Sequence, residues 1–589
     1  MSFFDLLTMI GGLALFLYGM HLLGEGLSQL SGGRLESILE KLTNNPIKAV
    51  LMGAGVTAVI QSSSATTVMV VGFVNSGIMK LEQAVGIIMG ANIGTTVTSW
   101  ILSLTGIDSS SFFVQLLKPT SFSPILAIVG VVMIMFSHRD KTKSVGAILV
   151  GFAVLMFGMD TMSEAVKPLR DVPAFTSILT RFSNPILGML AGLILTAVIQ
   201  SSSASVGILQ ALCQTGAVGY GAAIPIIMGQ NIGTCVTAMI SGIGASRNAK
   251  RAALIHLYFN IIGTVIFMVI FYAINAVNPF AFLKESATPV GIAVIHSLFN
   301  VAATLCLLPF SKLLVKLATL TIREEDKPEA VTEEEKILGL LDVRFLDTPS
   351  YGVDQSRNVA CYMADMARES IILAIDLLNH YNEEKAARVV ALEDEVDRFE
   401  DALGSYLVKL SAKNLPEKDS NTLNTLLHCI GDFERISDHA RNLKEAAEEM
   451  YRKDLSFSDK AKEELRVFEQ AVTDILDLTV KSFREDDAEL AAQVEPLEEV
   501  IDSLNLDIKQ RHIKRLRKGK CTIELGFILS DISNNFERIS DHCSNIAIGM
   551  LEEGKSVFDP HAYLEKVKGE DNLDFAGKMM VYQQKYRLP

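Results

Sequence analysis

One stretch of this sequence occurs twice at a constant spacing, and it limits the possible folds more than any other feature. The first copy has Gln-Ser-Ser-Ser at 61–64 and Asn-Ile-Gly-Thr at 92–95, and the second has the same motifs at 200–203 and 231–234. Corresponding residues are 139 positions apart, with no insertion or deletion over roughly ninety residues. The chain therefore contains two copies of one structural unit.

Charge divides the chain into two parts. Residues 1–320 hold 17 Lys and Arg and 11 Asp and Glu, whereas residues 321–589 hold the other 36 and 56. A sparsely charged, apolar part followed by a densely charged, acidic part indicates an integral membrane domain and then a soluble domain. The acidic balance gives no support for nucleic-acid binding. Seven cysteines without a Cys-x-x-Cys pair indicate reduced thiols and no disulfide or zinc framework.

Apolar runs in the first part have about the twenty residues that a bilayer crossing needs. They are 4–28, 82–105, 120–137, 144–168, 222–243, 252–275 and 290–310. We therefore predict an all-α, polytopic membrane domain over 1–320. Its first repeat lies at about 4–137, its second at about 144–275, and a further helix at 290–310.

Two more apolar stretches, 47–79 and 186–219, are each interrupted in the middle by Gln-Ser-Ser-Ser. The runs on either side have only about fourteen residues, which is short for a crossing. Small polar residues at membrane depth are tolerated only where they are buried in protein or face a water-filled cavity. We predict two re-entrant helical hairpins whose tips lie near the midplane of the membrane.

Basic residues orient this domain. With 138–143 in the cytoplasm, twelve of the seventeen Lys and Arg of residues 1–320 face the inside of the cell. The N-terminus then lies outside the plasma membrane, and the soluble domain is cytoplasmic. Three crossings separate the two copies, so the second is inverted relative to the first. Inverted repeats with broken helices at the midplane are typical of secondary transporters.

The chemistry at the hairpin tips is polar and neutral. Lys48 is the only ionisable side chain between Pro46 and Gly77, and none lies between Pro185 and Gly216. Free N–H groups at a helix that starts at the serines suit an oxyanion, and hydroxyl and carbonyl oxygens suit an alkali cation such as Na⁺. A nucleophilic serine would need a base or acid nearby, so we do not expect an enzyme. A single break of this kind would be explained by a helix kink or a helix cap. Two breaks at a constant spacing favour a functional site.

Other polar residues of this domain keep two interpretations open. The threonines of the second motif suit a binding site and helix packing equally. They are Thr95, Thr98, Thr234 and Thr237. The pattern His-x-x-Phe-Asn occurs at 256–260 and again at 296–300, where we expect polar pairing between helices. Ionisable side chains outside the tips leave proton coupling open; these are Glu25, Asp160, Glu164, His256 and His296.

Together, the paired Gln-Ser-Ser-Ser units, the Asn-Ile-Gly-Thr motifs and the His-x-x-Phe-Asn pairs resemble the sodium-dependent phosphate cotransporter family, the type II group. The resemblance covers residues 1–320 and implies symport of inorganic phosphate with Na⁺. It also implies which residues line the site: Gln61, Ser62, Ser63, Ser64, Asn92, Thr95, Gln200, Ser201, Ser202, Ser203, Asn231 and Thr234. Cys235 stands where the first copy has Thr96, so the second copy lacks that hydroxyl.

The second part begins with a charged linker at 321–349. From 350 to 553, apolar residues recur every three or four positions with charged residues between them, which predicts antiparallel helical bundles. This part is duplicated too, because Phe-Glu-Arg-Ile-Ser-Asp-His occurs at 433–439 and at 536–542. Glu and Asp at i and i+4 share one helix face. Two such faces could hold a hard metal ion, or they could be solvated and paired with arginine. The tail 554–589 receives no assignment.

The segment 350–553 resembles the PhoU family, whose members have two three-helix bundles, can bind metal clusters and take part in phosphate regulation. The resemblance implies a divalent or iron-type metal on the acidic motifs. The candidate ligands are Glu393, Asp397, Glu434, Asp438, Glu498, Asp502, Glu537 and Asp541. A homo-oligomer or a regulatory protein partner would bind through this domain.

The sequence thus predicts a Na⁺-coupled phosphate carrier that works by alternating access and is regulated by a cytoplasmic PhoU-like domain. Three alternatives stay open. The same fold could export phosphate, because a carrier's direction follows the gradients. It could be a membrane-tethered phosphate sensor that moves little substrate. It could also carry another tetrahedral oxyanion, such as sulfate.

Overall fold

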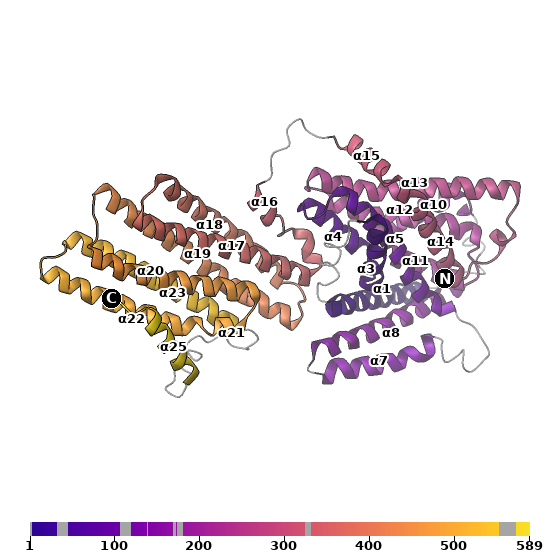
Figure 1. The fold of residues 1–589 in the computed structure, drawn as a ribbon. Helices are drawn as coiled ribbons and strands as arrows, with labels where there is room; N and C mark the ends of the chain where they lie inside the picture. Colours follow the sequence, from indigo (N-terminus) through magenta and orange to yellow (C-terminus); the bar gives the residue numbers. More distant parts are fainter. Residues whose placement is uncertain are drawn as a thin grey trace. The chain divides into compact units, whose positions relative to one another are not determined.

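The computed structural model describes residues 3–31, 45–106, 119–137, 139–168, 172, 181–323, 332–552 and 573–589. Every regular element in these ranges is a helix, and their one β-bridge joins Gly219 to Ser286 (Figure 1). The expected all-α fold is therefore confirmed. The chain divides into two compact units, Met1–Tyr351 and Gly352–Pro589.

Six described helices of the first unit are long and apolar enough to cross a membrane. Five are α1 (Phe3–Ser31), α5 (Leu81–Ser103), α8 (Asp140–Val166), α12 (Tyr220–Ser241) and α13 (Arg247–Val277). The sixth runs from α14 (Pro289–Leu307) through η4 (Leu308–Phe310) into α15 (Ser311–Thr321). A shorter helix, α7 (Pro119–Phe136), contains Pro124 and packs on α8.

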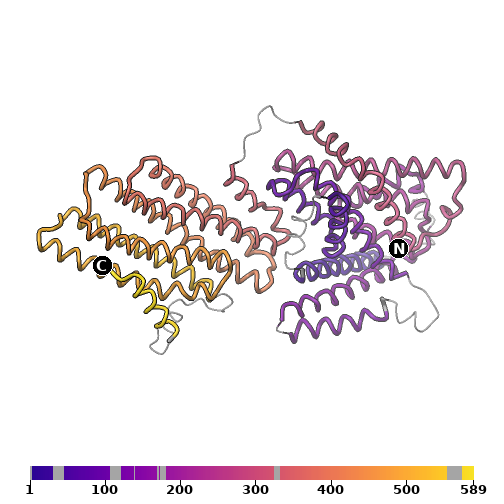
Figure 2. Tube along the Cα trace, in the orientation of Figure 1, coloured from indigo at the N-terminus to yellow at the C-terminus, as the bar shows by residue number. Residues whose placement is uncertain are grey.

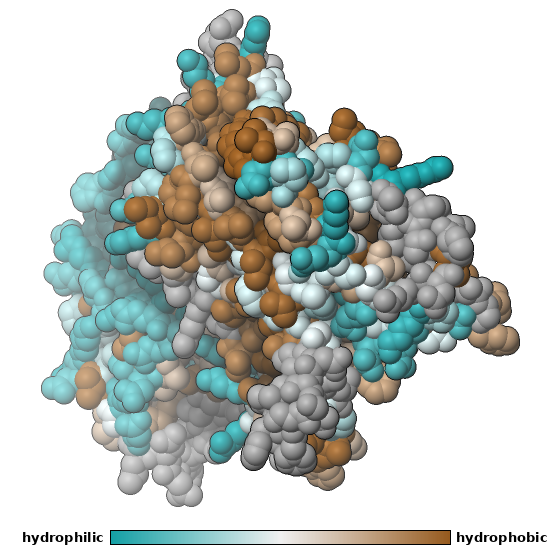
Figure 3. All heavy atoms as spheres, turned by 90° about the vertical axis from the view of Figure 1, so that its right-hand side faces the viewer, coloured by the Kyte–Doolittle hydropathy of each residue, from teal (hydrophilic) through white to brown (hydrophobic). Residues whose placement is uncertain are grey.

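Apolar side chains cover much of the surface of this unit. Figure 3 shows apolar side chains, in brown, gathered on the face that is turned toward the viewer. Val198 is 77% exposed and Val277 is 89% exposed, although both belong to long apolar segments. Such surface is unfavourable in water and suits contact with lipid tails.

The duplicated motifs lie in duplicated structure. Four helices too short to span a bilayer flank the Gln-Ser-Ser-Ser motifs: α3 (Pro46–Ile60), α4 (Ser63–Asn75), α10 (Pro185–Ile199) and α11 (Ser202–Gln214). All their bounds differ by 139 between the copies, and α5 and α12 begin 139 residues apart as well. The repeat in sequence is therefore a repeat of local fold.

Glycines bring the helices of each copy close together. A Cβ added at Gly90 of α5 would overlap the Val50 carbonyl oxygen of α3, and one added at Gly229 of α12 would overlap the Met189 carbonyl oxygen of α10. Such close contact between backbones is typical of membrane helices, where small residues form the interface. The same glycines thus set the same packing in both copies.

Helices α1 and α8 hold corresponding places in the two copies, since Gly19 and Gly158 are 139 residues apart. Their contacts run in opposite directions, because α1 glycines at 12, 19 and 26 approach Met162, Leu155 and Ile148 of α8. The two helices therefore pack antiparallel, and they lie side by side in Figure 1.

The predicted linker 321–349 contains structure in its described part. It includes α16 (Glu333–Leu338) and the 3₁₀ turn η5 (Val343–Asp347), after which α17 (Pro349–Asn379) begins. Phe345 is fully buried, with its ring 5.4 Å from that of Phe73 in α4 and 5.1 Å from that of Tyr351. This segment is therefore part of the packed first unit.

The second unit is built from long helices that lie along one another, and the chain can be followed through them in Figure 2. Besides α17 they are α18 (Glu383–Ser411), α19 (Glu417–Arg452), α20 (Asp459–Glu485), α22 (Val494–Arg517) and α23 (Ile523–Leu551), with the short α21 (Ala488–Ala491) between α20 and α22. The predicted three- and four-residue spacing forms the core, since Leu392, Val396, Phe399 and Leu403 are all fully buried.

The two copies of the acidic motif meet between α19 and α23. His439 Nδ1 bonds to Asn535 Oδ1 at 2.8 Å, and His542 Nδ1 bonds to Asp432 Oδ1 at 2.8 Å. The two imidazole rings are 5.6 Å apart. Within the tail, α25 (Leu573–Lys585) packs on α22, and residues 553–572 lie outside the described ranges.

Candidate functional site at two broken helices and two acidic clusters

Each break in the apolar helices starts with a glutamine whose backbone has the left-handed helical conformation. Gln61 ends α3 with φ 61°, and Gln200 ends α10 with φ 59°. Their amides donate to the Thr57 and Thr196 carbonyls at 2.8 and 2.7 Å, which closes the last turn of each helix. A glutamine with positive φ is uncommon, since glycine and asparagine adopt this conformation more easily. Both copies nevertheless have it.

A serine cap follows each glutamine. The Ser62 hydroxyl accepts from the Ala65 amide at 3.1 Å, and the Ser201 hydroxyl accepts from the Ala204 amide at 3.2 Å. Both serines have extended backbone angles, as an N-cap requires. Each break is therefore two residues long, and a new helix starts at the next serine.

The first turns of α4 and α11 keep donors available. The amides of Ser63, Ser64, Ser202 and Ser203 make no hydrogen bond to the described part of the chain. The first amides of any helix lack a partner within the helix and lie at its positive end. Ser63, Ser202 and Ser203 are nevertheless almost fully buried. The breaks thus present neutral donors in a sheltered place, which is the chemistry expected of an oxyanion site.

The two breaks meet. The Ser64 hydroxyl donates to the Gln200 carbonyl at 3.4 Å, and the Thr237 hydroxyl donates to Ser64 Oγ at 3.3 Å. Ser64 belongs to the first copy, while Gln200 and Thr237 belong to the second. The structure therefore joins the two predicted tips through oxygen atoms of both copies.

Thr98 positions the first glutamine. Its hydroxyl donates to Gln61 Oε1 at 2.9 Å, while Gln61 Nε2 bonds to the Ala58 carbonyl. The sequence left Thr98 and Thr237 undecided between binding and packing. Each threonine stands three residues after an Asn-Ile-Gly-Thr motif, at the same position in both copies. This repetition was the signal that could have added them to the candidates.

Asn92 lies at a fully buried polar junction. Its Nδ2 donates to Asn260 Oδ1 at 3.3 Å, and Asn260 Nδ2 bonds to Cys235 Sγ at 3.3 Å and to the His256 carbonyl at 3.0 Å. Asn260 in α13 thus connects α5 of the first copy to α12 of the second. The sequence gave Asn260 a structural role only.

Within the described part of the chain, three predicted site residues form side-chain hydrogen bonds only inside their own helices. The hydroxyls of Thr95 and Thr234 and the amide of Asn231 each donate to the carbonyl four residues earlier. These bonds leave the carboxamide oxygen of Asn231 and the second lone pairs of both hydroxyls available to a ligand.

The two histidines of the His-x-x-Phe-Asn pairs differ in their contacts. His296 Nδ1 bonds to Ser99 Oγ of α5 at 2.8 Å, which is the expected pairing between helices. Both ring nitrogens of His256 are buried and lack a hydrogen-bond partner in the described part of the chain.

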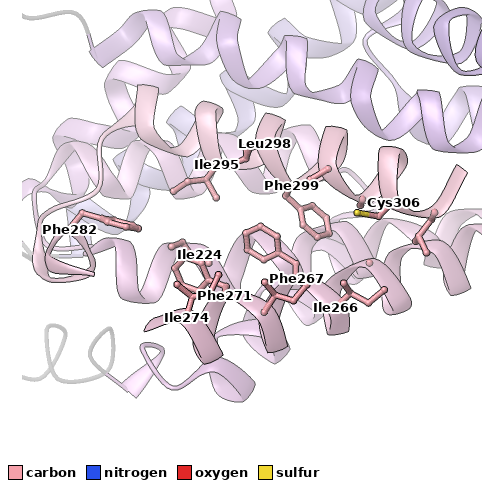
Figure 4. A pocket seen from close by; sticks show the side chains of 15 residues that line it. Ile224, Ile266, Phe267, Phe271, Ile274, Phe282, Ile295, Leu298, Phe299 and Cys306 are labelled. Atoms are coloured by element: carbon pink, nitrogen blue, oxygen red, sulfur yellow. The ribbon is translucent and has the colours of Figure 1, made fainter. Parts of the chain in front are cut away.

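An apolar cavity of about 360 Å³ lies between α13 and α14, away from the serines. Figure 4 shows Phe267, Phe271 and Phe299 pointing into it, with Phe282 at one end. Its lining offers no charge and only the weak S–H donor of Cys306, so we do not assign the anionic substrate to it.

The first acidic cluster forms between α18 and α19. Carboxylate oxygens of Asp397, Glu434 and Asp438 lie within 4.8 Å of one another. Burial raises the pKa of Asp397 and of Glu434, and the neighbouring Asp438 raises both further. Asp397 and Glu434 also line an open cavity of about 610 Å³, into which His542 reaches from the other copy. Carboxylates held this close suit a hard cation.

The second cluster forms at the corresponding place between α22 and α23. It consists of Glu498, Asp502 and Asp541, and Glu498 also lies within reach of Glu495 and Glu499. Burial raises the pKa of Asp541, against the opposing effect of Arg538. The residues therefore fit a metal ion in both copies by donor type and spacing.

Two predicted ligands lie outside these clusters. Glu393 accepts two hydrogen bonds from Arg441 Nη1, at 3.0 and 2.8 Å, and Glu537 accepts one from Asn505 at 2.5 Å. Burial raises the pKa of Glu393, and Arg441 opposes that shift. In the second copy Ser544 replaces Arg441, at the offset of 103. In the first copy, Arg441 thus neutralises the charge of Glu393.

Comparison with known families matches both parts of the chain. Residues 15–164 and 156–286 each match the Na⁺/Pi-cotransporter family, and residues 361–447 and 465–548 each match the PhoU domain. Two matches for each family agree with the two duplications. The transporter family is not an enzyme family, and together with the six apolar helices it indicates a multi-pass membrane protein.

Named relatives cover the whole chain or single parts of it. A Salmonella typhimurium protein named for inorganic phosphate export, YjbB, is 25% identical over 93% of this chain and 98% of its own length. The PhoU homolog 1 of Thermotoga maritima, named as an accessory protein of phosphate-specific transport, is 27% identical over 33% of this chain and 84% of its own. The rat sodium-dependent phosphate transport protein 2A is 38% identical over 16% of this chain and 15% of its own.

These matches confirm the family that the paired serine motifs resemble. Over residues 15–286 the chain belongs to the Na⁺/Pi-cotransporter family, and its C-terminal part contains two PhoU domains.

Proposed function

We propose that this protein carries inorganic phosphate across the plasma membrane together with Na⁺, by alternating access, and that its C-terminal unit regulates the carrier from the cytoplasm. The observation that carries the proposal is the meeting of the two breaks, where the Ser64 hydroxyl donates to the Gln200 carbonyl. Phosphate as the substrate follows from the family, since N–H groups and hydroxyls alone do not choose between tetrahedral anions.

Phosphate would bind to donors from both copies. The available amides of Ser63 and Ser64 and of Ser202 and Ser203 stand at the positive ends of α4 and α11, where an anion is favoured. Hydrogen bonds to a charged acceptor are about twice as strong as neutral ones. A site without fixed positive charge can also release the anion, which a carrier must do in each cycle.

Na⁺ would be the second substrate. Ser64 Oγ, Thr237 Oγ1 and the Gln200 carbonyl are hard, neutral oxygens drawn together from both copies, and such ligands suit an alkali cation. A bound cation would offset part of the charge of phosphate inside the membrane. The carboxamides of Gln61, Asn92 and Asn231 and the hydroxyls of Thr95 and Thr234 would complete the lining of the site.

Alternating access needs two copies of opposite orientation. The antiparallel packing of α1 on α8, which hold corresponding places, supports an inverted second copy. In this arrangement the helices α3–α4 and α10–α11 are re-entrant hairpins. In the proposed orientation the N-terminus lies outside and residue 320 and the second unit lie in the cytoplasm, which the excess of Lys and Arg in the inner loops supports.

Metal binding would give the second unit a way to sense its surroundings. Asp397, Glu434 and Asp438 would hold one divalent or iron-type ion, and Glu498, Asp502 and Asp541 another. The metal would neutralise part of the negative charge that the carboxylates of each cluster bring together. Either a homo-oligomer or a regulatory protein would read the resulting change.

Flux of labelled phosphate in proteoliposomes tests the proposal. Wild-type protein is expected to take up phosphate with an inward Na⁺ gradient and not with an equal K⁺ gradient. The combined variant Ser63→Ala and Ser202→Ala should lose this uptake. Ser163→Ala is the matched control, because its buried hydroxyl donates to the Met159 carbonyl of its own helix. Uptake that survives in the double variant would remove the site assignment.

Export is the second candidate, and the name of the full-length Salmonella relative favours it. Cells that lack the protein would then accumulate phosphate, whereas loss of an importer would lower cellular phosphate. In vesicles, export without Na⁺ coupling predicts equal flux in Na⁺ and K⁺. Saturable phosphate binding without flux would instead identify a sensor. Equal competition by sulfate would show that the site does not select phosphate.

A further inference from the structure

A short segment of the first unit connects helices of the two copies. Asp342 Oδ2 accepts from Asn75 Nδ2, at the end of α4, at 2.6 Å. Arg344 Nε donates at 2.9 Å to the carbonyl of Ser241, the last residue of α12. Asp342 and Arg344 also pair with each other at 2.6 Å, and their side chains are only 3% and 11% exposed. Two charges this well buried hold a fixed geometry.

Phe345 inserts beside this ion pair. Its ring packs on Phe73 and Tyr351, and a Cβ added at Gly72 of α4 would lie 2.8 Å from its edge. Position 211, the counterpart of Gly72 in α11, is an alanine. The missing methyl group of Gly72 therefore makes room for Phe345 in the first copy.

The counterpart of Asn75 is connected differently. Gln214, 139 residues later, ends α11 and donates to Thr105 Oγ1 at 2.7 Å. The loop between α13 and α14 closes this end, through the Ser286 hydroxyl on the Gly216 carbonyl. That loop joins two helices of the first unit. By contrast, η5 is followed directly by α17, which begins at Pro349 in the first unit and continues as one helix into the second.

We propose that Asp342, Arg344 and Phe345 form a latch through which the C-terminal unit controls the movement of α4 relative to α12. The inference rests on the proposed transport function. In alternating access, hairpin α3–α4 must move relative to the other copy, and the latch connects the two. The side chains of the latch have to leave Asn75, Gly72 and Ser241 before that movement. Because α17 begins two residues after the end of η5 and continues into the second unit, a change of state there would reach the latch along this helix.

Two substitutions weaken the latch from opposite sides. Phe345→Ala removes the ring, with Phe345→Leu as a milder form, and Gly72→Ala fills the space that the ring occupies. Each should raise phosphate exchange across proteoliposomes roughly fivefold or more, since coupling between sites typically changes an equilibrium by that factor. The effect should fall on the maximal rate, because neither residue belongs to the binding site. Hydrogen exchange of residues 342–351 should become faster in each variant.

The double variant tests whether the two substitutions act through one contact. Gly72→Ala should add nothing in a chain that already carries Phe345→Ala. Val343→Ala, exposed in the same turn, and Gly55→Ala, which has open space around it, should behave like the wild type.

Independent, multiplying effects would overturn the latch. Unchanged exchange rates despite faster hydrogen exchange at 342–351 would overturn it as well. A wild-type protein that moves no phosphate under any gradient would count against the proposed function and, with it, against the latch. A working wild-type carrier with unaffected variants would count against the latch alone.

Discussion

Thr98 holds the side chain of Gln61 through a single hydrogen bond of 2.9 Å. The other end of this carboxamide, Nε2, bonds to the Ala58 carbonyl, so Thr98 fixes the position of the carboxamide oxygen. Thr98→Val keeps the shape of the residue and removes the donor. We expect phosphate flux to fall roughly three- to tenfold, since one such bond contributes about 1 kcal/mol.

Thr98→Ser should recover most of the lost flux, because it restores the hydroxyl. Thr319→Val is the control, since the Thr319 hydroxyl donates to the Val315 carbonyl within α15. The measurement is initial phosphate uptake over a range of phosphate concentrations. Full activity of Thr98→Val would mean that the orientation of Gln61 is irrelevant to transport.

The acidic clusters predict a pH dependence. Burial and neighbouring carboxylates raise the pKa of Asp397 and Glu434, so the folded chain holds these protons more tightly than the unfolded chain. The free energy of unfolding of the metal-free second unit should therefore fall as pH rises through the raised pKa values, and it should recover as the pH is lowered toward the ordinary pKa values of these carboxyl groups. Added Mn²⁺ should reverse the trend, because protons compete with the metal at low pH.

Thermal unfolding at several pH values, with and without Mn²⁺, measures this effect. Asp397→Asn should stabilise the metal-free chain at pH 7 and weaken the response to Mn²⁺. Asp507→Asn, at an exposed position of α22, should do neither. If the stability of the wild-type chain changes with neither pH nor Mn²⁺, the clusters are only solvated helix faces.

The residues at the two breaks were predictable because the sequence repeats them. The repetition of Gln-Ser-Ser-Ser identified the serines of both breaks, and the structure brings Ser64 to Gln200. The roles of Thr98, Thr237 and Asn260 were not predictable in the same way. Their contacts join helices from different parts of the chain, and only the packed fold brings those helices together.

At the scale of elements, the interruption of two apolar runs by serines predicted broken helices, and the described structure has them. Asn45 and Asn184 cap α3 and α10, each followed by proline, so the helix starts also agree with their sequence. The structure of 332–349 was not predictable, because its charged composition resembles that of a linker. Its helical turns depend on the contacts of Asp342 and Phe345 with α4.

Close helix packing predicts which glycines tolerate a methyl group. Gly90→Ala and Gly229→Ala should separate α3 from α5 and α10 from α12, because the added Cβ meets a backbone oxygen that cannot move away easily. We expect a loss of thermal stability of the purified protein by several degrees or a failure to fold, as overpacking costs about 1–3 kcal/mol.

Gly55→Ala provides the matched comparison within α3. Nothing lies within 4 Å of the added Cβ, and alanine favours a helix over glycine by about 1 kcal/mol. Its unfolding temperature should therefore stay the same or rise. Equal damage from all three substitutions would show that the glycines matter for a reason other than helix contact.

At the scale of the molecule, charge alone separated an apolar part from an acidic part near residue 320. The compact units divide later, after Tyr351, because the described residues 332–351 pack on the first unit. Two shortened chains separate the roles of these segments. A chain of residues 1–351 retains the latch, and a chain of residues 1–323 lacks it.

Both shortened chains should bind phosphate in detergent, since neither loses a residue of the breaks. The shorter chain should exchange phosphate across vesicles faster, because nothing then connects the end of α4 to that of α12 through Asp342 and Arg344. The measurement is exchange of labelled phosphate at equal protein content. Equal rates in the two chains would assign any regulation to residues beyond 351.

The bond from Ser64 to Gln200 joins residues 136 positions apart, and this separation has a consequence for how the protein is made. At the usual speed of translation, the first break waits on the order of ten seconds before its partner leaves the ribosome. During that time α3 and α4 are each too short to span a bilayer, and their serines have no opposite surface. We therefore expect the newly made first half to be more accessible to quality-control proteases than the completed chain.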